Sequence, residues 1–122
     1  MSSAACPYCA VAREDVWVAN DQAFAIPHPQ PIARFHMVIA PARHTAAFYD
    51  LDVQEQRAIW DIMREIQKRL KGEMDLAGVH VGFEDGQSEQ DHSCVHLIPK
   101  PLDRVVDLPA EIEWVYIEGD DA

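Results

Sequence analysis

Hydrophobic positions between residues 52 and 72 recur with the period of a helix. Asp52 followed by Glu55 matches a capping box, and Gly72 follows the last hydrophobic position. The spacing predicts one long amphipathic helix that turns a single stripe toward the core. The stripe consists of Ile59, Ile62, Met63, Ile66 and Leu70.

The other hydrophobic segments are short and have the length of strands. Residues 15–20 and 23–26 read as a hairpin turning at Asn20-Asp21, and Pro27, Pro29 and Pro31 predict an extended loop after it. Further strands are expected at residues 36–40, 79–83, 92–98 and 112–117, with Pro99 ending the strand before it. The pattern predicts an α+β fold with a mostly antiparallel sheet of about five strands and one long helix.

Length and charge limit the possible classes of protein. The 122 residues are 48% hydrophobic, which predicts one folded domain over residues 1–122 with a short acidic tail at 118–122. A net charge of -11 disfavours binding to nucleic acid or to an anionic membrane. No apolar run could span a bilayer and no signal peptide is evident, so the expected location is cytoplasmic. An anionic ligand would need local positive charge, for which Arg34, Arg43 and Lys100 are candidates.

Three reactive side chains alternate near the C-terminal end of the chain. His92, Cys94 and His96 fall on every second residue, so an extended strand would point all three to one face. Histidines beside a thiol can hold a metal, or can lower the pKa of the thiol and yield a thiolate. A half-buried strand that happens to alternate is the simpler alternative. The scarcity of histidine and cysteine in this chain favours a reactive site.

Cys6 and Cys9 form a second constellation, a Cys-x-x-Cys pair near the N-terminus. A tetrahedral zinc site needs two further ligands, which would be histidines from elsewhere in the chain. The same spacing is found in dithiol redox proteins, but there the pair follows a strand, and only five residues precede Cys6. Zinc is therefore the favoured hypothesis, with redox chemistry and two buried thiols as alternatives.

The ordered set of motifs resembles the histidine triad (HIT) family of nucleotide hydrolases and transferases, in particular its zinc-bearing bacterial type. The segment from Phe35 to His44 is similar to the family's Gly-His-x-Leu-Val-Ile-Pro-x-x-His, and 92–100 is similar to its triad strand. The remaining matches are residues 6–9, 20–26, 79–82 and 112–115.

This resemblance implies a homodimer that binds a nucleotide and breaks a bond at its α-phosphorus. It implies a structural zinc held by Cys6, Cys9, His44 and His92. Cys94 takes the place of the family's nucleophile, with His96 and His36 as its catalytic neighbours. The resemblance further implies substrate contacts at Gln87 and Ser88 before the triad and at His28 near the ribose. Lys100 is a further candidate contact because of its charge, with a solvated charge at the rim as the alternative.

Several positions depart from the family pattern. The middle histidine of the triad is Cys94, and the loop before the triad is one residue longer and contains Glu89 and Asp91, which are adverse to a phosphate. His28 replaces an acid that contacts ribose in relatives. Two asparagines of the preceding strand are replaced by His80 and Glu84.

Three hypotheses follow from this pattern. The first is a nucleotide phosphohydrolase or nucleotidyl transferase that acts through Cys94 or through a water positioned by His96. The second is a catalytically inactive HIT domain that serves as a binding or regulatory module. The third is a zinc or thiol sensor in which Cys94, beside His92 and His80, is reactive or binds a metal.

Overall fold

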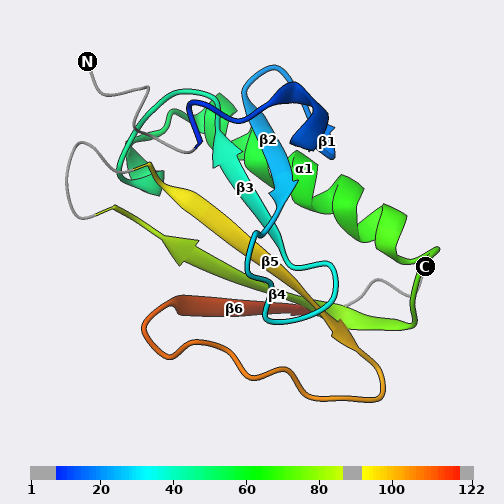
Figure 1. The fold of residues 1–122 in the computed structure, drawn as a ribbon. Helices are drawn as coiled ribbons and strands as arrows, with labels where there is room; N and C mark the ends of the chain where they lie inside the picture. Colours follow the sequence, from blue (N-terminus) through cyan, green and yellow to red (C-terminus); the bar gives the residue numbers. More distant parts are fainter. Residues whose placement is uncertain (1–7, 87–91, 119–122) are drawn as a thin grey trace.

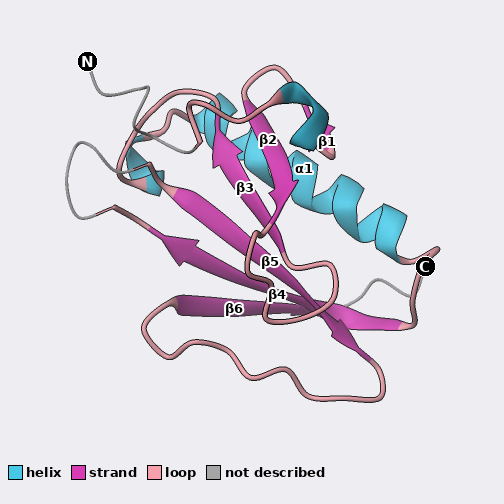
Figure 2. Ribbon diagram, viewed as in Figure 1, coloured by secondary structure: helices cyan, strands magenta, loops and turns pink. Residues whose placement is uncertain are grey.

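The fold is a six-stranded antiparallel sheet with one long helix, seen in a computed structural model that describes residues 8–86 and 92–118 (Figures 1 and 2). The strand order across the sheet is β1-β2-β3-β5-β4-β6. The predicted α+β class is confirmed. The sheet has six strands where about five were expected, and the shortest of them, β1, has two residues. The strands are β1 (Val18–Ala19), β2 (Ala23–Pro27), β3 (Met37–Pro41), β4 (Leu76–Glu84), β5 (Cys94–Pro101) and β6 (Glu113–Glu118).

Helix α1 (Val53–Leu70) begins at the predicted capping box. The Asp52 side chain accepts a hydrogen bond from the Glu55 backbone N–H at 2.8 Å, and the Asp52 N–H donates to the Glu55 carboxylate at 3.0 Å. The predicted stripe is buried, and Ile59 and Ile66 have no exposed surface. No helix in the described parts of the chain is long and apolar enough to cross a membrane.

Helix α1 covers one face of the sheet at the end formed by β1, β2 and β3 (Figure 1). The core lies between them and includes Met37, Ile39 and Leu97 from the strands. Because side chains alternate across a strand, Val38, Cys94 and His96 face away from the helix. The candidate site therefore lies on the face that α1 does not cover.

The first hairpin is shorter than predicted. The Asn20 side chain accepts hydrogen bonds from the N–H groups of Gln22 and Ala23, which forms the expected turn. The segment Arg13–Asp15 is a single 3-10 turn, so the expectation of a strand from residue 15 was wrong.

Pro99 does not end the strand that contains it. Strand β5 continues to Pro101, with Val79 opposite Pro99 on β4. Strand β3 pairs with β5 only from Val95 to Leu97. Beyond Leu97, β5 therefore has a neighbouring strand on one side only, which is β4. Proline is tolerated there because its missing N–H faces no partner strand.

Candidate functional site

A chain of hydrogen bonds joins three side chains on the uncovered face of the sheet. His36 Nε2 lies 3.0 Å from His96 Nδ1, and His96 Nε2 lies 2.7 Å from Glu84 Oε1. His36 comes from the residue before β3, whereas His96 and Glu84 come from the neighbouring strands β5 and β4. Gly82 stands directly opposite His96 in the sheet, so no β4 side chain fills the space beside the ring.

The proton positions in this chain follow from its first donor. The Ile32 N–H donates to His36 Nδ1 at 3.3 Å, so the neutral His36 ring carries its proton on Nε2 and donates it to His96. His96 then carries its own proton on Nε2 and donates it to the Glu84 carboxylate. The pKa of His36 is lowered to about 4, mainly by burial and also by the nearby rings of His28 and His96. His36 is therefore neutral at physiological pH.

His28 completes a group of three histidine rings. It stacks on His36 with ring centroids 4.3 Å apart and an angle of 16° between the planes, and its centroid lies 5.5 Å from that of His96. The Gln30 N–H donates to His28 Nδ1, so the neutral ring carries its proton on Nε2. The structure therefore brings the rings of His28, His36 and His96 together.

Cys94 lies next to these groups but in an acidic environment. Its Sγ is 3.8 Å from Glu84 Oε1 and 4.0 Å from His96 Nε2, and only 4% of the residue is exposed. The pKa of the Cys94 thiol is raised to about 12, mainly by burial and also by the negative charges of Glu84 and Asp85, whereas the hydrogen bond with Tyr8 lowers it. The histidine rings thus do not supply the thiolate that the sequence pattern suggested, because burial and the Glu84 carboxylate 3.8 Å from the sulfur both favour the protonated thiol.

A second cluster consists of Cys9, His44 and His92. Cys9 Sγ lies 3.3 Å from His44 Nδ1 and 3.7 Å from His92 Nδ1. His92 Nε2 lies 2.8 Å from the Pro41 carbonyl, so this nitrogen carries the proton and the Nδ1 lone pair is directed to the cluster. A second nitrogen held by a backbone carbonyl is the usual arrangement of a zinc-ligating histidine.

These three residues fit zinc by the chemistry of their donors. Thiolate sulfur and imidazole nitrogen are its preferred ligands, and all three ligand atoms lie within 4.8 Å of one another. Cys6, the fourth implied ligand, lies outside the described residues. A bound zinc would hold the segment around Cys9 against the start of β5.

The three alternating residues of the triad segment do not form one site. Strand β5 starts at Cys94, and His92 lies before it with its ring between Cys9 and the Pro41 carbonyl. Cys94 and His96 lie within β5, and their side chains are together on the face of the sheet that α1 does not cover. The expectation that all three project into one pocket was wrong for His92, because the strand geometry begins two residues later.

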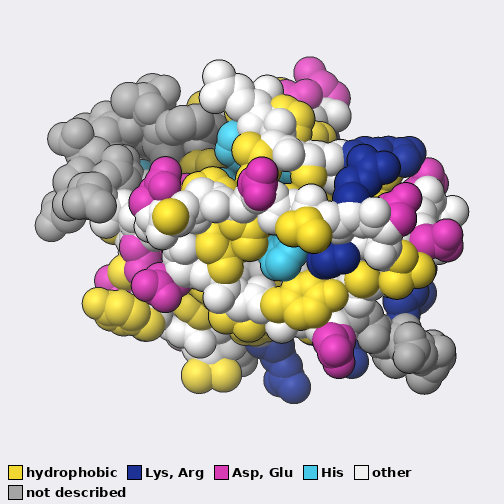
Figure 3. Space-filling view, turned by 90° about the horizontal axis from the view of Figure 1, so that it is seen from below, with side chains coloured by type: hydrophobic (Ala, Val, Ile, Leu, Met, Phe, Trp, Pro, Cys, Tyr) yellow, Lys and Arg dark blue, Asp and Glu magenta, His cyan; other side chains and the backbone are white. Residues whose placement is uncertain are grey.

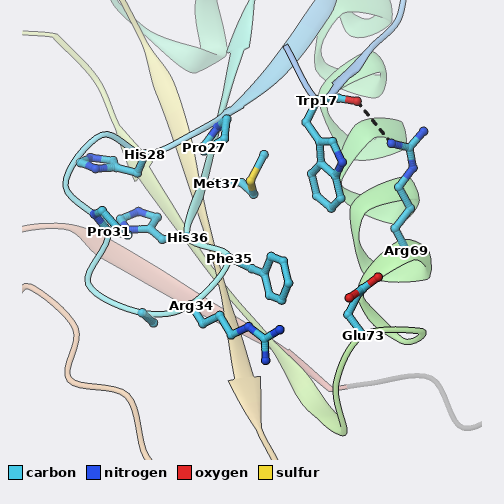
Figure 4. A pocket seen from close by; sticks show the side chains of 11 residues that line it. Trp17, Pro27, His28, Pro31, Arg34, Phe35, His36, Met37, Arg69 and Glu73 are labelled. Carbon is cyan, nitrogen blue, oxygen red and sulfur yellow. Dashed lines mark hydrogen bonds between the residues drawn. The ribbon is translucent and has the colours of Figure 1, made fainter. Parts of the chain in front are cut away.

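A pocket of about 780 Å³ opens beside two of the three histidines. Figure 4 shows His28 and His36 on one side of it and Trp17 and Arg69 on the other, with Phe35 pointing between them. The remaining labelled side chains that line it are Pro27, Pro31, Arg34, Met37 and Glu73. The walls are mostly apolar, with two arginines at the rim.

The other predicted site residues lie elsewhere or outside the described residues. Gln87 and Ser88, with Glu89 and Asp91, fall in the segment that is not described. Lys100 shares a face with His96 but lies four residues further along β5, roughly 13 Å at the usual rise per residue. Arg43 binds the Glu55 carboxylate through two nitrogens, each at 2.9 Å, and so stabilises the start of α1.

His80 does not join Cys94. Its neighbours across the sheet are Ile98 and Tyr116, and its ring centroid is 5.0 Å from that of Tyr116. Burial lowers its pKa, and the charge of Lys100 acts in the same direction. Figure 3 shows a histidine beside a basic side chain, surrounded by hydrophobic side chains. The sensor hypothesis is therefore wrong in placing Cys94 beside His80.

Glu84 is the functional residue whose place the sequence did not reveal. It was noted as a departure from the family, but its position opposite Cys94 depends on the register of β4 and β5. Trp114 shares a face with Tyr116 next to the site, with its ring over Gly82 and 6.2 Å from that of His96. The number of residues between β4 and β5 does not determine which residues of the two strands lie opposite each other.

Residues 10–101 match the sequence model of the HIT domain, so this chain belongs to the HIT domain family. No curated protein is significantly similar to it in sequence. A zinc-bound histidine triad family protein from Mycobacterium smegmatis is similar in structure with a TM-score of 0.72 and 18% identity, over 86% of this chain and 81% of that one.

Two further solved structures are similar. The histidine triad nucleotide-binding protein of Candida albicans has a TM-score of 0.62 and 24% identity, over 79% of this chain and 74% of that one. The NitFhit protein of C. elegans has a TM-score of 0.68 and 14% identity, over 83% of this chain and 25% of that one. This chain thus spans a quarter of NitFhit, and at these identities the likeness establishes the fold alone.

Proposed function

We propose that this HIT domain binds a nucleotide or a related phosphorylated small molecule and hydrolyses it at the α-phosphorus with water, rather than Cys94, as the nucleophile. The observation that carries the proposal is the hydrogen-bonded chain from His36 through His96 to Glu84. The structurally similar protein from Candida albicans is a nucleotide-binding protein by name, which supports the choice of ligand.

The pocket beside the histidines suits the nucleoside part of such a ligand. Its volume of about 780 Å³ lies within the usual range for small-molecule sites. Trp17 and Phe35 offer flat apolar surfaces for a base, and Arg34 and Arg69 supply positive charge in a protein whose net charge is -11.

The phosphate end of the ligand would lie at the histidines. The Nε2–H of His28 is a donor for a phosphate oxygen or a ribose hydroxyl. Gln87 and Ser88 retain the role that the family resemblance gives them, as further donors to phosphate. Lys100 lies too far along β5 to contact the α-phosphorus and could contact only a more distant part of the ligand.

Hydrolysis would proceed by attack of a water molecule at phosphorus. The water oxygen forms a bond to phosphorus, the bond from phosphorus to the leaving group breaks, and the proton of the water passes to the Glu84 carboxylate, which the Nε2–H of His96 holds in place. General base catalysis by such a pair contributes about 10²- to 10⁴-fold to a rate. Cys94 is a poor nucleophile in comparison, because its thiol is buried beside a carboxylate.

A second candidate function is binding of the nucleotide without turnover. The acidic surroundings of Cys94 favour it, since Glu84 and Asp85 oppose the approach of a phosphate. In this case the domain would act as a binding or regulatory module.

A homodimer remains part of the proposal. Strand β6 is an edge of the sheet, and its Val115 is 49% exposed on the face that α1 packs against. Trp60 on α1 is 40% exposed and packs near Phe83 of β4. Two copies paired along β6 would bury these side chains and remove the open edge. Light scattering that gives the mass of a single chain would contradict this part.

Titration with AMP and incubation with adenosine phosphoramidate or diadenosine polyphosphates, without added metal, test the function. We expect binding and turnover, with turnover reduced at least about 100-fold in His96→Asn and retained in Cys94→Ala. The matched control His80→Asn changes a histidine on the same face, away from the cluster, and should leave turnover unchanged.

Each other outcome has a definite meaning. Loss of turnover in Cys94→Ala would assign the attack to the thiol. Binding without turnover in the unmodified protein would establish the second candidate. An absence of both binding and turnover would overturn the proposed function.

A further inference from the structure

Three different ligand atoms converge on the uncovered face of the sheet, at the position of the family nucleophile. They are Oε1 of Glu84, Sγ of Cys94 and Nε2 of His96. The distance from oxygen to nitrogen is 2.7 Å, from sulfur to oxygen 3.8 Å, and from sulfur to nitrogen 4.0 Å. The group shares no residue with the cluster of Cys9, His44 and His92.

We infer that Glu84, Cys94 and His96 form a second metal site, which binds a divalent transition metal such as zinc through three protein ligands and leaves the fourth position open. Around a tetrahedral zinc, standard bond lengths place oxygen and nitrogen about 3.3 Å apart and sulfur about 3.5 Å from either. The observed triangle therefore needs its oxygen-to-nitrogen side to open by about 0.6 Å, and its sulfur-to-oxygen and sulfur-to-nitrogen sides to close by about 0.3 and 0.5 Å.

The exposure of these residues permits that adjustment. Cys94 and His96 are 4% and 6% exposed and fixed in β5, whereas the Glu84 side chain is 54% exposed at the end of β4. A carboxylate at the surface can rotate to admit an ion between itself and the ring. The metal would enter from the side of Glu84, and the same side would offer the open position to water.

The charges of the group favour a dication. A Glu84 carboxylate and a Cys94 thiolate together carry two negative charges, and Asp85 adds a third nearby. In the metal-free protein the carboxylates of Glu84 and Asp85 oppose a bound phosphate, and a divalent ion offsets their charge. Binding displaces the thiol proton into water, and the Glu84 carboxylate and Cys94 thiolate then balance the two positive charges of the ion.

His36 would serve as the outer partner of the ligating histidine. Metal at His96 Nε2 moves the ring proton to Nδ1, which can donate to His36 Nε2 at the observed 3.0 Å. His36 then carries its proton on Nδ1 and gives up the 3.3 Å hydrogen bond from the Ile32 N–H. The bond from Ile32 is the longest of the three hydrogen bonds that link Ile32, His36, His96 and Glu84, so moving the His36 proton costs little.

The neighbouring trio of His28, His36 and His96 is a weaker candidate for the same ion. The rings of His28 and His36 are stacked within 16° of parallel, so their nitrogen lone pairs lie in nearly parallel planes and do not converge. His36 Nε2 is also occupied by the hydrogen bond to His96. The mixed group of carboxylate, thiol and imidazole has the better geometry.

This inference does not depend on the proposed function, which concerns the metal-free protein, because metal alone can be titrated in the absence of nucleotide. Co²⁺ is the probe, since its visible and near-ultraviolet absorption reports thiolate ligation and tetrahedral geometry. It is added to the protein as purified and binding is followed by absorption and by equilibrium dialysis. We expect one Co²⁺ ion per chain at this site with a sulfur-to-cobalt band that Cys94→Ser removes.

Matched variants separate this site from the other cluster. Glu84→Gln should weaken Co²⁺ binding at least about tenfold, whereas Glu113→Gln, on the neighbouring strand and the opposite face, should not change it. Cys9→Ser should leave the Cys94-dependent band in place. Circular dichroism of Cys94→Ser and Glu84→Gln checks that both variants fold.

Two results would overturn the inference. One is a cobalt band that survives in Cys94→Ser and disappears in Cys9→Ser. The other is equal Co²⁺ binding by the unmodified protein, Cys94→Ser and Glu84→Gln. If the metal binds but no nucleotide does, the inference stands and the proposed function fails.

Discussion

The rings of His36 and His96 share a hydrogen bond of 3.0 Å between Nε2 and Nδ1, with the two residues 5% and 6% exposed. The two residues are sixty positions apart in sequence and meet because β3 and β5 are neighbours in the sheet. A charge on His36 would be buried beside a second histidine, so its neutral form is strongly favoured.

The stability of the protein should fall with acidification through the titration of His36. The unfolded chain takes up a proton at this residue near pH 6.5, whereas the folded protein does so only near pH 4. The unfolded state therefore binds more protons between these values, and up to about 3 kcal/mol of folding free energy is lost as the pH falls through that window. Urea unfolding of the unmodified protein and of His36→Asn should show that the difference in their unfolding free energies shrinks as the pH falls from about 6.5 to about 4. A difference that is constant with pH would contradict the assignment.

Phe35 has a backbone conformation that favours glycine. Its φ is 65°, which is the one positive value among non-glycine residues in the described parts of the chain. Phe35→Ala and Phe35→Gly both lose the ring, but glycine tolerates this φ without strain. We expect Phe35→Gly to be more stable than Phe35→Ala by about 1 kcal/mol in denaturant unfolding.

Phe24 in β2 provides the control for that comparison, because its φ is not positive. There the usual order should hold, with the alanine variant more stable than the glycine variant by roughly 0.5–1 kcal/mol. The same order at both positions would show that Phe35 carries no strain.

Gly82 leaves room for the Trp114 ring beside the site. A Cβ at position 82 would lie 2.6 Å from Cζ3 of Trp114, closer than atoms can approach. Gly82→Ala should therefore displace the indole, change the tryptophan fluorescence and destabilise the protein by about 1–3 kcal/mol. In the double variant with Trp114→Ala, the cost of the Gly82 change should largely disappear, and simple additivity would rule out this contact as the cause.

The cluster of Cys9, His44 and His92 predicts a structural zinc. With Cys6 as the fourth ligand, the closed site should hold about one zinc per chain through dialysis. Cys9→Ser should lower the zinc content by about one per chain and lower the melting temperature, because the metal contributes to folding. Elemental analysis that finds the same zinc content in the unmodified protein and in Cys9→Ser would refute this assignment.

The local parts of the fold could be predicted from the sequence. Asp52 and Glu55 are three residues apart and their hydrogen bonds depend only on that spacing, so the start of α1 was correct. The side-by-side placement of Cys94 and His96 likewise follows from the alternation within a strand.

The non-local parts could not be predicted. The pairing of Glu84 with Cys94 depends on the register of two strands, and the contact of His36 with His96 depends on the strand order of the sheet. The extension of β5 beyond Pro99 depends on β3 being too short to pair there. In each case tertiary contacts decide the outcome, and a single sequence does not contain them.

His92 and Cys94 are two residues apart, about 7 Å of extended chain, yet they belong to different groups of ligands. A metal bound to His92 would therefore fix the backbone just before β5 begins, and with it the position of the Cys94 sulfur. The two clusters are thus joined by two residues of backbone, so a change in the position of His92 is expected to shift Cys94 as well.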